Sequence, residues 1–124
     1  MKRFAIVVAM LIGCGGASPA LAQDPLKVAP KTYSVVFEND QVRVLRATIN
    51  PGDKVPMHDH PNHIIVPLDT VTAKFGLPDG KSVDAAMKTG EPIWSDATKH
   101  APESTSKQPA RVIIIELKGK AGAK

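Results

Sequence analysis

The sequence is poor in cysteine, in aromatic residues and in long apolar runs, and each shortage excludes a class of protein. The single cysteine, Cys14, excludes an internal disulfide framework. Aromatic residues make up 4% of the chain, so a core must rest on valine, isoleucine and leucine. Basic residues are not interleaved with aromatic ones, and we therefore expect no nucleic acid partner. The apolar run at residues 4–12 is far shorter than the roughly 20 residues of a membrane span, so no span is expected.

The first 22 residues have the pattern of a secretory signal peptide. Two basic residues precede the apolar run, and Ala20 and Ala22 form an A-x-A cleavage site. This pattern predicts cleavage after Ala22, loss of Cys14 and a periplasmic product. Residues 11–14 also resemble the lipobox of bacterial lipoproteins, so a protein anchored through a lipid on Cys14 is the alternative.

The rest of the chain alternates between β-rich segments and turn residues. No segment beyond the signal peptide carries a helical period over twelve or more residues, and turns recur every 8 to 12 residues or so. This spacing is typical of a single all-β domain, either a sandwich or a small barrel. We predict an N-terminal arm at residues 23–32, one β domain at residues 33–118 and a basic tail at residues 119–124. Strands are expected at residues 33–38, 42–49, 71–77, 81–87 and 110–117, with one or two more at residues 54–67 and a short one that begins at residues 93–94.

Four histidines stand out as candidate metal ligands: His58, His60, His63 and His100. On a strand, side chains two apart project from the same face, so His58 and His60 can point at one ion. His100 can supply a third nitrogen if its strand lies beside theirs, as happens in a barrel. The sequence places no second carboxylate and no nucleophile near them, which disfavours a hydrolase or an epimerase.

Two segments resemble the motifs of the cupin family. Pro51-Gly52 precedes His58-Asp59-His60 as in the first cupin motif, where a glycine turn leads to an H-x-H pair. Gly90-Glu91-Pro92 precedes His100 as in the second motif. The resemblance spans roughly residues 35–118 and implies an antiparallel jelly-roll barrel of about six to eight strands with a metal inside. It is also compatible with a homodimer that forms through sheet edges.

The chain departs from the family at the fourth ligand. The glutamate of the first motif would stand at Ile64 or Ile65. Regular alternation would point His63 away from His60, towards the pocket rim or the surface, unless Pro61 and Asn62 break the strand. His63 therefore has two readings, ligand or rim residue. Other candidates for the fourth position are Glu103 and, preferred over both, water or substrate.

The expected cofactor is one divalent transition metal ion: iron, zinc, copper, nickel or manganese. Three protein ligands and an open position are typical of a catalytic site, and a neutral ligand set favours an anionic ligand there. The resemblance suggests a metal-dependent oxygenase acting on a small organic molecule. The alternatives are a non-catalytic module that binds a small anion and a barrel that has lost its metal. Trp94 is expected to pack in the core rather than line the pocket.

Overall fold

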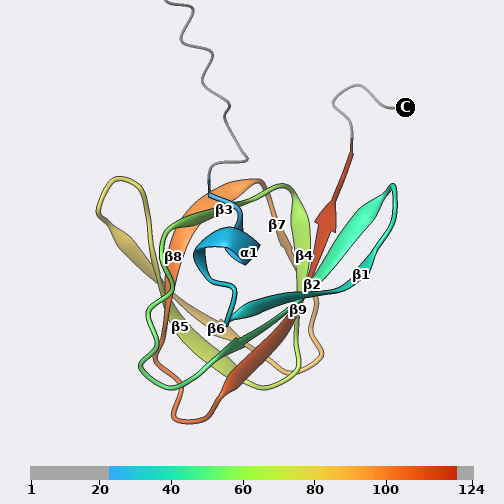
Figure 1. The fold of residues 1–124 in the computed structure, drawn as a ribbon. Helices are drawn as coiled ribbons and strands as arrows, with labels where there is room; N and C mark the ends of the chain where they lie inside the picture. Colours follow the sequence, from blue (N-terminus) through green and yellow to red (C-terminus); the bar gives the residue numbers. More distant parts are fainter. Residues whose placement is uncertain (1–22, 120–124) are drawn as a thin grey trace, which may run out of the picture.

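The computed structural model describes residues 23–119, which form two antiparallel sheets (Figure 1). One sheet has the strand order β1-β2-β9-β4-β7 and the other the order β3-β8-β5-β6. Their bounds are β1 (Tyr33–Glu38), β2 (Val42–Ile49), β3 (His58–His60), β4 (His63–Pro67), β5 (Val71–Gly76), β6 (Ser82–Met87), β7 (Ile93–Ser95), β8 (Thr98–Ser104) and β9 (Ala110–Leu117). The predicted signal peptide, its cleavage site and Cys14 lie outside the described residues, as do residues 120–124 of the predicted tail.

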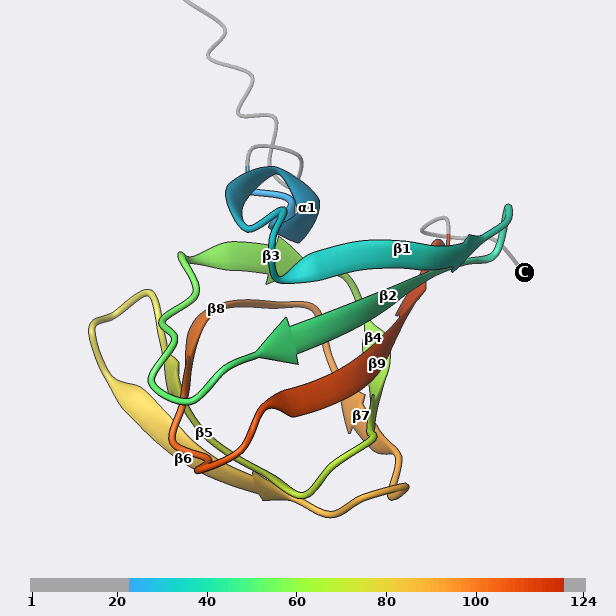
Figure 2. The same cartoon turned by 60° about the horizontal axis from the view of Figure 1, so that its bottom comes forward.

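The two sheets enclose one interior, which Figure 2 shows as a ring of strands. The last strand, β9, lies between β2 and β4, and β8 lies between β3 and β5. Strands that are distant in sequence therefore become neighbours. The all-β class is confirmed, and the expected segment at residues 54–67 contains two strands, β3 and β4, separated by Pro61 and Asn62.

Side-chain alternation along the strands separates the interior from the surface. On β9, Ala110, Val112, Ile114 and Glu116 are buried, while the residues between them are more exposed. This is the period of two expected for a strand with one buried face. The glutamate occupies an inward position in an otherwise apolar series, so its carboxylate must be satisfied inside the barrel.

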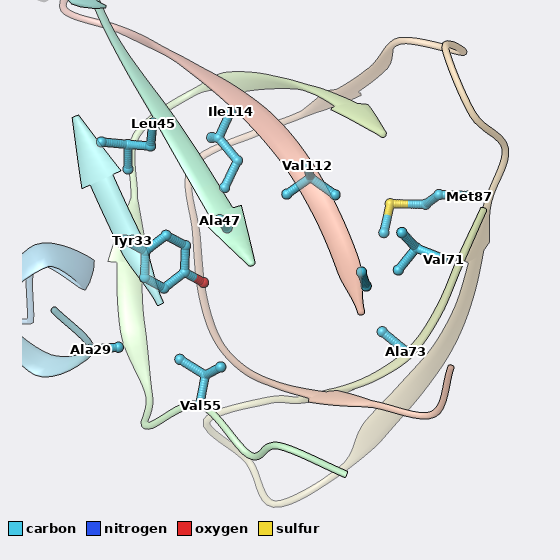
Figure 3. Close-up of a cluster of buried hydrophobic side chains, with 11 residues drawn as sticks. Ala29, Tyr33, Leu45, Ala47, Val55, Val71, Ala73, Met87, Val112 and Ile114 are labelled. Atoms are coloured by element: carbon cyan, nitrogen blue, oxygen red, sulfur yellow. The ribbon is translucent and has the colours of Figure 1, made fainter. Parts of the chain in front are cut away.

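The apolar core is built from small and aliphatic side chains, as the low aromatic content requires. Figure 3 shows Leu45 of β2 and Ile114 of β9 on one wall, with Val71 of β5 and Met87 of β6 on the opposite wall. Burying each large aliphatic side chain stabilises the fold by roughly 1.5–3 kcal/mol. Tyr33, the one aromatic residue in this cluster, turns its hydroxyl towards the interior (Figure 3).

Residues 23–32 form more than an extended arm, because they contain the short helix α1 (Pro25–Val28). The Asp24 side chain accepts a hydrogen bond from the Leu26 amide at 2.8 Å and caps the helix. Pro25 suits the first turn because its missing N–H needs no partner there. The Asp59 amide donates to the Gln23 carbonyl at 2.9 Å, which attaches the arm to β3. No helix within residues 23–119 has the length and apolar character needed to cross a membrane.

Candidate metal centre

Strand pairing brings three of the predicted ligands together. His58 and His60 are 0% and 3% exposed, and both point inward from β3. His100 stands directly opposite His58 in the antiparallel register of β3 with β8. One ligand nitrogen from each of these three residues lies within 4.8 Å of the others, a group that could hold a metal ion. The strand that carries His100 therefore lies beside the strand that carries His58 and His60, as expected.

The tautomers inferred from hydrogen bonds suit metal binding. His58 Nδ1 donates to the Pro56 carbonyl at 2.8 Å, so His58 Nε2 carries a lone pair. This atom lies 3.1 Å from His60 Nε2. Two nitrogens that each bind one ion at about 2.1 Å from adjacent positions lie about 3 to 3.5 Å apart. The donor set therefore fits a divalent transition metal, since imidazole is a common ligand for zinc, copper, iron and nickel.

His63 lies inside the barrel and lines its cavities, so of its two readings the one that places it at the surface is wrong. It is 0% exposed, and its ring centroid is 4.9 Å from that of His60. Pro61 and Asn62 interrupt the strand, and Asn62 holds this break because its side chain accepts from the Ala97 amide at 2.7 Å. His63 Nδ1 donates to the Pro61 carbonyl at 2.7 Å. Within residues 23–119, His63 Nε2 is buried without a hydrogen-bond partner.

The alternation on β4 also corrects the position of the missing carboxylate. His63 and Ile65 both line the interior cavity, so Ile64 between them faces the opposite side of the sheet. A glutamate on this strand could therefore face the cavity only from position 63 or position 65, and position 63 is occupied by His63. Glu103 is one residue out of phase with the buried Pro102 and Ser104 on β8, and it does not join the histidines.

Glu116 is the site residue that the sequence reasoning missed. It is 2% exposed, and its Oε1 lies 3.5 Å from His60 Nδ1, a distance long for a hydrogen bond. Arg43 donates to both Glu116 oxygens at 2.9 and 3.0 Å and to Asp24 at 2.8 Å. Burial opposes ionisation of Glu116, but the neighbouring His60 and Arg43 outweigh it and lower its pKa. The sequence did contain a signal for Glu116. It follows Val112 and Ile114 at intervals of two residues on one strand, so its side chain points to the same inward face as theirs.

Tyr33 is a second residue that the sequence did not indicate. Its hydroxyl lies 3.0 Å from His58 Nε2, and its ring meets the His58 ring edge-on with centroids 5.1 Å apart. Because His58 Nδ1 already donates to a carbonyl, the hydroxyl is the donor in this bond. Burial, with a contribution from Glu116, raises the Tyr33 pKa, which keeps the hydroxyl protonated.

Burial keeps His58, His63 and His100 neutral. Desolvation is the largest cause in each case, and it lowers the pKa of His58 to about 4 and that of His100 to about 3. It also lowers the pKa of His63. The other histidines add to the effect, because a second positive charge nearby is unfavourable. Imidazoles must be neutral to bind a metal, so these three side chains are held in their ligand form at neutral pH.

Three cavities meet the histidine cluster. A charged cavity of about 890 Å³ reaches His60 and is lined by Asp24, Glu38, Arg43, Asp59, Lys99, Glu116 and Lys118, among others. An interior cavity of about 40 Å³ lies between Tyr33, the histidines and the apolar core. An apolar groove of about 380 Å³ reaches His63 and His100 between Phe75, Leu77, Val83, Ile93 and Trp94. Trp94 is 54% exposed, so its expected place in the core was wrong.

Comparison with known proteins places this geometry in a known fold. No protein-family model matches the chain, and no curated protein matches it either. Solved structures do match. A cupin-domain protein from Bordetella pertussis is 24% identical over 70% of this chain and 92% of its own, with a TM-score of 0.65. The protein has the cupin fold. The predicted single antiparallel jelly-roll barrel is thereby confirmed.

Two further solved structures extend the comparison. A protein with a double-stranded β-helix domain from Klebsiella pneumoniae is 20% identical, with a TM-score of 0.57 over 73% of this chain and 78% of its own. The polyketide cyclase RemF from Streptomyces resistomycificus is 19% identical, with a TM-score of 0.52 over 70% of this chain and 64% of its own. At these identities the likeness establishes the cupin fold and leaves the activity to the site.

Proposed function

We propose that this cupin binds one divalent transition metal ion through His58, His60 and His100 and uses it to oxygenate a small organic molecule. The observation that carries the proposal is that one ring nitrogen from each of His58, His60 and His100 lies within 4.8 Å of the others, with His58 and His100 kept neutral by burial. A bound ion would supply the redox and Lewis-acid chemistry. The chain itself contributes the ligands and a dry wall, and the Glu116 carboxylate lies 3.5 Å from His60 Nδ1, where it would favour a proton on that atom and leave Nε2 for the ion.

The apolar groove supports an organic substrate with a largely apolar body. No charged side chain lines it among the residues described, and it leads to His63 and His100. A volume of about 380 Å³ lies within the usual range for small-molecule pockets, which begins at about 300 Å³. One structure of similar fold is a polyketide cyclase, an enzyme that acts on organic molecules.

The decisive experiment combines metal content with oxygen uptake. Elemental analysis of protein purified without a polyhistidine tag should find about one transition metal ion per chain, and His58→Ala, His60→Ala or His100→Ala should each lose it. Metal content with oxygen uptake in the presence of apolar aromatic compounds would support the enzyme. Metal content without any turnover would support the alternative, a non-catalytic module for a small anion, which the interior cavity of about 40 Å³ favours by its size. A protein that binds no metal would exclude both.

We further propose that His63 supplies a fourth ligand in place of the family's glutamate. Its orphaned Nε2 and its inward position support this role. His63→Glu should retain metal and shift its preference towards harder ions such as Mn(II) and Fe(II). Ile64→Glu is the matched control, since residue 64 faces away from the cavity, and it should leave the metal preference unchanged. If His63→Ala binds metal as tightly as the wild type, His63 is not a ligand.

Export to the periplasm remains a prediction that rests on residues 1–22. Intact-mass measurement of the native protein should give a chain that begins at Gln23, and a lipid-bearing chain that begins at Cys14 would contradict it. A homodimer is likewise a prediction. Exposed Val35, Val36 and Phe37 on the outer strand β1 make that edge the candidate surface, and the mass in solution tests it.

A further inference from the structure

Tyr33 and a metal ion compete for the same lone pair, the one on His58 Nε2. The Tyr33 hydroxyl donates to His58 Nε2 at 3.0 Å, and His58 Nδ1 is occupied by the Pro56 carbonyl at 2.8 Å. His58 can therefore bind an ion only through Nε2. An ion at this nitrogen displaces the hydrogen bond from Tyr33, because an imidazole nitrogen has one lone pair in the ring plane.

The displaced hydroxyl then needs another acceptor. Tyr33 is 4% exposed, so water outside the barrel does not reach it freely. Within residues 23–119, His58 is the one side chain to which its hydroxyl is hydrogen-bonded. The space beside it is the interior cavity of about 40 Å³, which is walled by apolar side chains and by His60, His63 and His100. A buried hydroxyl without a partner is costly, which favours a ligand that fills this cavity and accepts its hydrogen bond.

We propose that Tyr33 recognises the exogenous ligand of the metal centre, and that it selects a hydrogen-bond acceptor of two or three atoms. The inference rests on the proposed metal site. The size limit comes from the cavity, whose volume of about 40 Å³ gives room for about three water-sized atoms, at roughly 10–15 Å³ for each. The chemical class comes from the Tyr33 hydroxyl, which lines this cavity and has a hydrogen to donate once His58 Nε2 is occupied. Small anions such as azide, cyanate or hydroxide meet both conditions.

Removal of the Tyr33 hydroxyl should raise the affinity for the metal ion and lower the affinity of the loaded protein for azide. In Tyr33→Phe, His58 Nε2 loses its competing donor, so Co(II) should bind about two- to tenfold more tightly in competition with a chromophoric chelator. Azide binding to the Co(II)-loaded protein, followed by visible absorption, should weaken by about tenfold or more, because a hydrogen bond to an anion is lost. A purely structural role for Tyr33 would weaken both affinities together. Phe37→Leu is the control, since Phe37 lies on the same strand as Tyr33, is 55% exposed and lines none of the three cavities, and it should change neither.

The wild-type protein offers a second measurement that needs no variant. Tyr33 is the only tyrosine in the chain, so selective ¹³C labelling at Cζ gives one assigned NMR signal. This signal should move when Zn(II) displaces the bond to His58, and it should move again when azide is added. Equal azide affinities in wild type and Tyr33→Phe, both loaded with metal, would overturn the role of Tyr33 alone. A phenolate-to-metal absorption band in the Cu(II)-loaded wild type would overturn it too, because Tyr33 would then be a ligand. Absence of metal binding in the wild type would overturn the metal site, and the inference with it.

Discussion

The two sides of the histidine cluster differ in their chemistry. Behind His60, Arg43 links Glu116 and Asp24, and Lys99 lies 3.7 Å from Asp59 in the same charged cavity. On the other side, the apolar groove reaches His63 and His100 without a charged lining residue among those described. The larger cavity is thus the more polar one. Size alone would select it as the binding site, although its charges are already paired with one another.

This difference indicates a division of roles. On the charged side, Glu116 is held by Arg43 and lies 3.5 Å from His60 Nδ1, so a carboxylate faces the outer side of this imidazole. An apolar wall has no internal partner, so it is free to contact the body of a substrate. We infer that the charged side positions the metal ligands and that the apolar side admits the substrate.

The largest expected effect concerns the charged side. Arg43→Met leaves Glu116 buried with its charge unpaired, and the free energy of unfolding should fall by about 3–5 kcal/mol. Arg111→Met is the control, since Arg111 forms a solvent-exposed pair with Asp69 and its replacement should change the free energy of unfolding far less. Urea denaturation measures both. Equal losses would mean that Glu116 is no more dependent on its partner than a surface carboxylate.

The pH dependence of stability tests the burial of the histidines between the two sides. The folded protein holds the pKa of His58 at about 4 and that of His100 at about 3, below the ordinary 6.5 of the unfolded chain. Between pH 6.5 and 4 the unfolded chain binds more protons, so the metal-free protein loses stability as the pH falls. The full contribution is present above pH 6.5, and His58 alone should account for a loss of about 3 kcal/mol once it is protonated in both states. A flat profile of unfolding free energy over this range would contradict the buried cluster.

Metal affinity should distinguish the carboxylate behind His60 from one that lies outside the cluster. Glu116→Gln keeps the shape but removes the charge that His60 Nδ1 faces, and metal should bind about 10- to 100-fold less tightly. Glu103→Gln, on the outward phase of β8, should leave the affinity unchanged. Chelator competition measures both. Equal affinities in Glu116→Gln and wild type would remove Glu116 from the site.

The smallest expected effect concerns the apolar side. Val83→Ser changes an exposed groove residue, so the free energy of unfolding should move by no more than about 0.5 kcal/mol. Binding of a neutral naphthylamine fluorophore should nevertheless weaken severalfold, because apolar contact area is lost. Lys99→Ala in the charged cavity is the control and should leave fluorophore binding unchanged. The reverse result, with loss only in Lys99→Ala, would reverse the assignment of the two sides.

The sequence by itself determined the β class, most of the strand positions and the pairing of His58 with His60. These features depend on local periodicity and on turn residues such as Gly52, Gly80 and Gly90, whose φ values of 78°, 84° and 77° are readily adopted by glycine. A period of two places neighbours on one face regardless of which strand lies alongside. His100 was also recognised, through its resemblance to the second cupin motif.

Only the tertiary structure decided which other groups surround the histidines. Glu116 and Arg43 are 73 positions apart in the sequence, and Tyr33 and His58 are 25 apart. Their meeting depends on β9 lying between β2 and β4, which no local pattern encodes. The inward turn of His63 depends on the break at Pro61 and Asn62, held by a hydrogen bond from Ala97. Periodicity sets the face to which a side chain points, while closure of the barrel sets what it meets there.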